Sequence, residues 1–132
     1  MPESKGRVLG IGGVFLKSQD QDRLSTWYAS NLGIEVGPYG GHFKWRAHDE
    51  PGREHLTAWS IFPSTSTYFD PSTAPFMINY IVDDLDALLE KLIRSGVRID
   101  PKREDHDYGR FAWVYDADGN KIELWQPAEQ IS

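Results

Sequence analysis

The hydrophobic positions of the chain follow one pattern twice. Residues 8–17 (VLGIGGVFLK) and 76–82 (FMINYIV) are rich in the apolar residues of strands, and each precedes a segment whose apolar side chains recur at spacings of three and four. That spacing is the period of an amphipathic helix. The helical segments cover 20–33 and 83–96, and each begins near an aspartate and ends at a glycine, which are common helix-capping residues.

Each helical segment is followed by further strand signals. We expect short strands at 34–37 and 97–100, and hairpins with a glycine in the turn at 42–62 and 110–126. Both halves of the chain therefore have the order β-α-β-β-β. A unit this small cannot cover its own sheet, so the two units are expected to pair and to enclose a cavity.

The two units divide at a stretch that lacks any periodicity. We predict one domain over 1–132, with module one at about 7–63, a Pro/Ser/Thr-rich linker at 64–74 and module two at about 75–128. The fold class is α+β. The expected architecture is a cup-shaped, incompletely closed mixed β-barrel with the helices outside.

Alternation along the strands divides the side chains between helix-facing and cavity-facing sets. In the last hairpin, the set suited to a helix is Ala112, Val114, Ile122 and Leu124, and the predicted cavity set is Phe111, Trp113, Tyr115, Glu123 and Trp125. The first strands of the two modules add Phe15, Met77 and Asn79 to the cavity.

The register of the first hairpin decides which of its faces lines the cavity. The predicted cavity set is His42, Lys44, Arg46, Thr57, Trp59 and Ile61, opposite an apolar set that includes Ala58 and Phe62. A slip of one residue would exchange the two faces. His48 and His55, which flank the turn of this hairpin, are expected on the surface, with a metal site there as the alternative.

Composition narrows the function classes. Five Trp, six Tyr and six Phe in 132 residues suit a pocket for a small molecule, although an aromatic core is the alternative for any one ring. The absence of cysteine excludes disulfides and thiolate chemistry. A net charge of −6 without a basic run argues against nucleic acid. No apolar stretch approaches a signal peptide or a membrane span, which predicts a cytoplasmic protein.

Three motifs resemble the vicinal oxygen chelate superfamily, which includes glyoxalase I, extradiol dioxygenases and the fosfomycin- and bleomycin-resistance proteins. They are WYASNLGIEV (27–36), YIVDDLDALLEKLIRSGVRI (80–99) and DADGNKIELWQP (116–127), and the resemblance spans 8–127. It implies the paired-module fold, a cavity for a small molecule and a homodimer.

The resemblance also implies four positions for metal ligands, which metal-dependent members fill with His, Glu or Gln. Carried over, these positions fall on Gly13, Trp59 (or Ala58 with a shifted register), Met77 and Glu123. Only Glu123 can ligate a catalytic divalent ion, which needs at least three protein ligands. The chain is therefore most similar in character to the bleomycin-resistance branch, whose members bind ligands without a metal, and no cofactor is expected.

These patterns predict a metal-independent protein that binds a small planar organic ligand, with an anionic ligand as one option. The expected ligand-binding residues are Phe15, Lys44, Arg46, Trp59, Met77, Asn79, Phe111, Trp113 and Trp125. The alternative is a lyase, isomerase or dioxygenase-type enzyme in which Glu123 is an acid/base or holds an atypical divalent metal. A third reading is a domain for protein interaction alone, whose cavity is filled by its own side chains.

Overall fold

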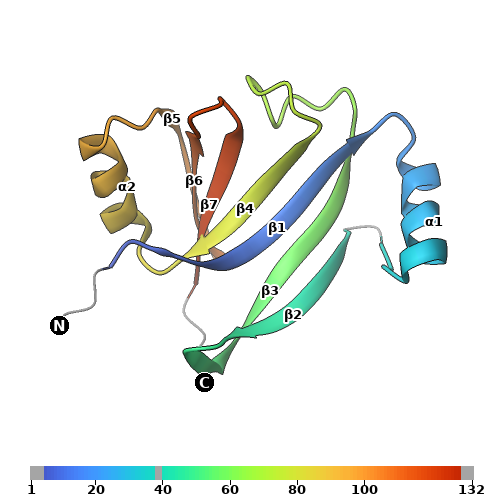
Figure 1. Ribbon diagram of the computed structural model, residues 1–132, viewed down its shortest axis with the longest axis horizontal. Coiled ribbons are helices and arrows are strands. Elements are labelled where there is room, and N and C mark those ends of the chain that lie inside the picture. Colours follow the sequence, from blue (N-terminus) through green and yellow to red (C-terminus); the bar gives the residue numbers. More distant parts are fainter. Residues whose placement is uncertain (1–4, 38–39, 129–132) are drawn as a thin grey trace.

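A computed structural model describes residues 5–37 and 40–128 as one curved sheet with two helices (Figure 1). The elements in chain order are β1 (Val8–Ser18), α1 (Gln21–Leu32), β2 (Gly41–Ala47), β3 (Glu50–Pro63), β4 (Phe76–Val82), α2 (Leu85–Arg94), β5 (Ile99–His106), β6 (Gly109–Tyr115) and β7 (Lys121–Pro127). Among these residues no helix has the length and apolar character needed to span a bilayer.

The seven strands are ordered β2-β3-β1-β4-β7-β6-β5. Each module pairs its first and last strands in parallel, β1 with β3 and β4 with β7. The modules join through the antiparallel pair β1–β4 at the centre, and the sheet does not close on itself. The α+β class and the cup-shaped, open mixed sheet predicted from the repeat are confirmed.

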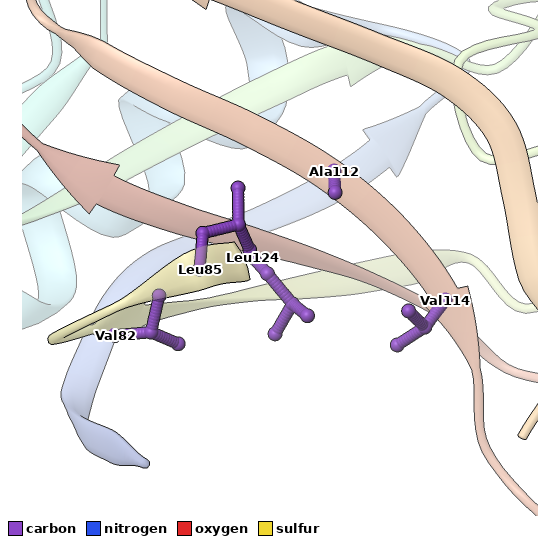
Figure 2. Close-up of a cluster of buried hydrophobic side chains, with 5 residues drawn as sticks. All are labelled: Val82, Leu85, Ala112, Val114 and Leu124. Carbon is purple, nitrogen blue, oxygen red and sulfur yellow. The ribbon is translucent and has the colours of Figure 1, made fainter. Parts of the chain in front are cut away.

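Helix α2 covers the second module as the apolar spacing predicts. The Asp84 side chain caps the helix by accepting a hydrogen bond from the Ala87 N–H at 3.1 Å. The fully buried Leu85 packs into a cluster whose other members come from β4, β6 and β7 (Figure 2). That cluster confirms the helix-facing set of the last hairpin; its members are Val82, Leu85, Ala112, Val114 and Leu124, with Ile122 packed against them.

Helix α1 is packed much more loosely. Asp20 accepts from the Arg23 N–H at 3.0 Å and Gly33 ends the helix with φ of 71°, so the predicted capping residues are confirmed. The helix buries none of its residues, and Trp27 and Leu32 are 51% and 59% exposed. The apolar stripe predicted for this helix is therefore only partly covered by the sheet.

Two predicted strands differ from the structure. Residues 34–37 form no strand apart from an isolated bridge between Gly37 and Gly40, and positions 38–39 between them lie outside the described residues. In module two the expected strand at 97–100 is instead β5, which runs from Ile99 to His106 and pairs with β6. Residues 102–105 of β5 are all charged, which suits an edge strand because it leaves most of its side chains in water.

The segment between the modules is more than a linker. It has no periodicity because it consists of turns, yet Phe69 is fully buried in it and Ser72 is almost so. Phe69 packs with Phe15 of β1 and Met77 of β4. The segment therefore belongs to the core that both modules share.

Strand β1 is irregular at Gly12, where its register with β4 shifts between Ile11 and Gly13. A Cβ at Gly12 would lie 2.3 Å from Asn79 Oδ1 and 2.7 Å from Ile81 Cγ1. Such approaches are far inside van der Waals contact, so the glycine provides the space that Asn79 and Ile81 occupy.

Gly12→Ala should therefore destabilise the protein by about 1–3 kcal/mol, as overpacking of a filled site does. Gly52→Ala is the matched control, because nothing lies within 4 Å of a Cβ there. Urea denaturation of both variants measures the difference. Equal stabilities for the two would contradict the packing described around Asn79.

Candidate functional site

The candidate site lies on a row of residues that crosses the centre of the sheet. Glu123 of β7 is in register with Asn79 of β4 on one side and with Trp113 of β6 on the other. Asn79 is in register with Gly13 of β1, which in turn pairs with Ala58 of β3. The second module supplies the polar side chains of this row, and the first supplies small residues that leave room for them.

Glu123 is 3% exposed, and its carboxylate accepts hydrogen bonds from three side chains. Asn79 Nδ2 donates to Oε1 at 2.6 Å, and Trp113 Nε1 donates to Oε2 at 3.0 Å. The third donor is the Tyr68 hydroxyl, which reaches Oε2 from the segment between the modules. A buried carboxylate requires such partners, because burial without them would cost several kcal/mol.

Tyr68 is held in the form that can donate. Burial, and then the negative charge of Glu123, raises the pKa of the Tyr68 phenol far above its ordinary value. The hydroxyl therefore keeps its proton at physiological pH. Tyr68 lies in the aperiodic segment, so no pattern in the sequence marked it as a site residue.

An aromatic and apolar cluster encloses this network on the face opposite α2. Phe15, Phe69, Met77 and Trp113 are buried in it, and Phe62 and Phe111 pack against it. Trp125 stacks on Phe111 with ring centroids 5.8 Å apart and planes 5° from parallel. The structure thus brings together six predicted ligand-binding residues around Glu123, namely Phe15, Met77, Asn79, Phe111, Trp113 and Trp125.

Trp59 does not join this group. It is buried on the α1 side of the sheet, with its ring centroid 4.7 Å from that of Tyr28. Its neighbours along β3 behave oppositely, since Ala58 and Phe62 pack against the aromatic cluster. The prediction placed Trp59 towards the cavity and Ala58 and Phe62 away from it, and the structure has the reverse. A register slip of one residue produces this exchange of the two faces of a strand.

Lys44 and Arg46 lie on the exposed strand β2, away from this cluster. The Arg46 guanidinium already has local partners: it lies 3.8 Å from Glu54 and donates to the Pro51 carbonyl at 2.9 Å. The structure therefore places neither residue beside Glu123.

Three other lysines lie over the aromatic cluster instead. Lys102 Nζ lies 5.3 Å from the ring centroid of Trp113, and Lys17 Nζ lies 4.9 Å from that of Phe69. Lys121 Nζ donates to the Tyr68 carbonyl at 2.9 Å and lies 5.8 Å from the Trp113 ring. Burial lowers the pKa of Lys121. The spacing of two residues between Lys121 and Glu123 is the signal that could have placed both on one face of β7.

The sequence match fixes the family. A model of the Glyoxalase/Bleomycin resistance protein/Dioxygenase superfamily matches residues 10–124. The chain belongs to this superfamily. No curated protein matches it at a significant level.

Solved structures of low sequence identity share the superfamily fold. The methylmalonyl-CoA epimerase of Mycobacterium tuberculosis is 22% identical, with 98% of this chain and 94% of that chain covered and a TM-score of 0.61. The Streptomyces coelicolor epimerase in complex with 2-nitronate-propionyl-CoA is 17% identical, with 96% and 99% covered and a TM-score of 0.67. A superfamily member from Vibrio splendidus 12B01 is 16% identical, with 88% and 97% covered and a TM-score of 0.54.

The residues at the site do not fit the divalent metal of the superfamily's enzymes. The strand register aligns Ala58, Gly13, Asn79 and Glu123. Ala58, the alternative given for a shifted register, therefore occupies this row and Trp59 does not, and Asn79 stands in the row in place of the predicted Met77. Asn79 Oδ1 and the Glu123 carboxylate are the only ligating groups in the row, fewer than the three that a catalytic ion requires. Within residues 5–37 and 40–128 no group of three His, Cys, Asp or Glu could hold a metal.

Replacing Glu123 by Gln should destabilise the protein by about 1–3 kcal/mol, because a neutral amide has one acceptor oxygen in place of two and accepts weaker hydrogen bonds than a carboxylate, so the three donors cannot all keep their bonds. Glu90→Gln is the control, since Glu90 is exposed on α2. Chemical denaturation of the two variants gives the comparison. A Glu123 variant as stable as the control would mean that the three donors do not need the carboxylate.

Proposed function

We propose that this protein is a metal-independent binding protein for a small planar organic ligand, and that Glu123 anchors the ligand. The observation that carries the proposal is the buried carboxylate itself, held by neutral donors among aromatic rings. Packing of a core does not require a charged group, and an apolar side chain of similar shape would avoid the free-energy cost of removing a carboxylate from water.

Tyr68 is the donor that a ligand would replace. Asn79 and Trp113 are fixed on strands of the sheet, whereas Tyr68 comes from the turns between the modules. A ligand N–H or O–H that takes the place of its hydroxyl would keep Glu123 satisfied while the phenol ring moves aside. The cavity expected from the repeat is filled by the protein's own side chains in this structure, so binding requires that movement.

The rings around Glu123 favour a planar ligand. Phe111 is nearly parallel to both Trp125 and Trp113, with angles of 5° and 21° between the planes. A flat molecule entering beside them would gain stacking contacts of about 0.5–1.5 kcal/mol for each ring pair. The ammonium groups of Lys102 and Lys121 near Trp113 support a ligand that also carries a negative group.

Two variants separate this proposal from a role in folding alone. Tyr68→Phe should tighten binding severalfold, because the hydroxyl no longer competes for Glu123, whereas Glu123→Gln should weaken it about tenfold or more. Tryptophan fluorescence can follow titrations with planar aromatic acids, planar amides and coenzyme A esters. Phe76→Leu, at an exposed position of β4, is the control and should leave binding unchanged.

Failure of every compound to bind the Tyr68→Phe variant would favour the reading in which the domain serves only protein interaction. Coenzyme A esters are included because similar structures are epimerases of such an ester. If an ester is turned over, and Glu123→Gln abolishes turnover while binding persists, the enzyme alternative with Glu123 as acid/base replaces the binding proposal.

We also propose a homodimer, in line with the family resemblance. The exposed Trp27 and Leu32 on α1 offer an apolar surface for a second copy. Sedimentation velocity should show a dimer for the native chain and a shift towards monomer for Trp27→Ser. A native chain that sediments as a monomer at high micromolar concentration would exclude this assembly.

A further inference from the structure

His55 lies at a different place on the sheet and has no role in the Glu123 network. It is 4% exposed, although the turn beside it predicted a surface position, and its ring is stacked on Trp45 with centroids 4.7 Å apart. Gly10 of β1 makes room for this stack, because a Cβ there would lie 2.2 Å from the Trp45 ring.

The stack carries buried polar atoms without partners. Neither His55 Nε2 nor Trp45 Nε1 has a hydrogen-bond partner within the part of the chain that the structure describes. Most buried polar atoms in proteins are satisfied, so each exception requires an explanation.

Two cavities share His55 as a lining residue. The smaller has a volume of about 180 Å³ and the larger about 330 Å³, and Arg53, Ile81 and Pro127 line both of them as well. Ile81 and Trp125 give the smaller cavity an apolar wall. The space is therefore apolar along one side, and charged and polar side chains, among them Arg53 and His55, line the rest.

The carboxylates that line these cavities are Glu50, Glu54 and Asp83, and none of them forms an ion pair with Arg53. No ion pair to Arg53 occurs among residues 5–37 and 40–128, while Glu54 pairs with Arg46 at 3.8 Å. Asp83 is also engaged, since it accepts from the backbone N–H groups of Gly6 and Arg7 at 2.9 and 2.8 Å.

Arg53 and His55 act on one another electrostatically. Burial, and then the positive charge of Arg53, lowers the pKa of His55, against a weaker opposite effect of Glu50. A ligand oxygen anion placed between the two side chains would offset the charge of Arg53 and favour the protonated form of His55.

We propose that Arg53 and His55 form a second binding site, separate from Glu123, for the carboxylate of a small organic acid with an apolar body. The guanidinium group of Arg53 offers paired N–H donors that match a carboxylate. The Nε2 atom of His55 supplies a further hydrogen bond when it carries its proton. Ile81 and Trp125 would cover the apolar body of the acid.

Benzoate is the probe for this site, with acetate and sodium chloride at equal ionic strength as comparisons. The full chain has four histidines, whose ring Cε1–H proton signals can be followed by NMR during titration. The His55 signal should move and saturate with a Kd on the order of 1 mM, tighter for benzoate than for acetate, while the other three signals stay in place.

Variants make the assignment specific. Arg53→Gln should weaken benzoate binding about tenfold or more, and His48→Gln, at an exposed position beside the same turn, should leave it unchanged. Glu123→Gln should also leave it unchanged, which separates this site from the proposed ligand site.

Three results would overturn the proposal: equal movement of all four histidine signals with salt, no movement of the His55 signal, or full binding in Arg53→Gln. Benzoate binding that is lost in Glu123→Gln but kept in Arg53→Gln would assign the probe to the Glu123 site instead.

Discussion

The buried carboxylate of Glu123 is the constraint on which the concave face of the sheet depends. A charge with 3% exposure is tolerated only where donors surround it, and three side chains from three segments do so. Their positions require β4, β6 and β7 to be in register and the segment between the modules to fold back onto the sheet. The charge therefore links the packing of the second module to that of the inter-module segment.

The two modules share a topology but contribute different kinds of residue to the site. The second module contributes Glu123, Asn79 and Trp113, whereas the first contributes Phe15 and Phe62 to the aromatic cluster and Gly12 and Gly13 beside Asn79. A side chain at Gly12 would displace the amide that holds Glu123. The two glycines of the first module thus leave the space that Asn79 of the second module occupies. Because Gly13 has no side chain to ligate a metal, they also explain why the ligand set of a divalent ion is incomplete here.

Sequence periodicity predicted the parts of the fold that are regular. Both helices and the helix-facing side of β7 follow from spacings of three, four and two residues. The aspartates at the helix starts and Gly33 cap the helices as their residue types predict, whereas the C-cap of α2 is Ser95, one residue before the predicted Gly96. The sequence did not predict which face of β3 carries Ala58 and which carries Trp59. Both faces of that strand carry apolar residues, so the pattern fits two registers that differ by one residue almost equally well. Tyr68 was not predicted, since its segment has no period, and His55 was placed on the surface because burial at a hairpin end depends on Trp45 and Gly10.

The central claim is that Tyr68 and Glu123 form one coupled unit. A double-mutant cycle with Tyr68→Phe and Glu123→Gln, measured by chemical denaturation, tests it most directly. The double variant should deviate from additivity by about 1–3 kcal/mol, as contacting residues in one network do. Effects that add within about 0.5 kcal/mol would show that the two side chains act independently, and would contradict the account.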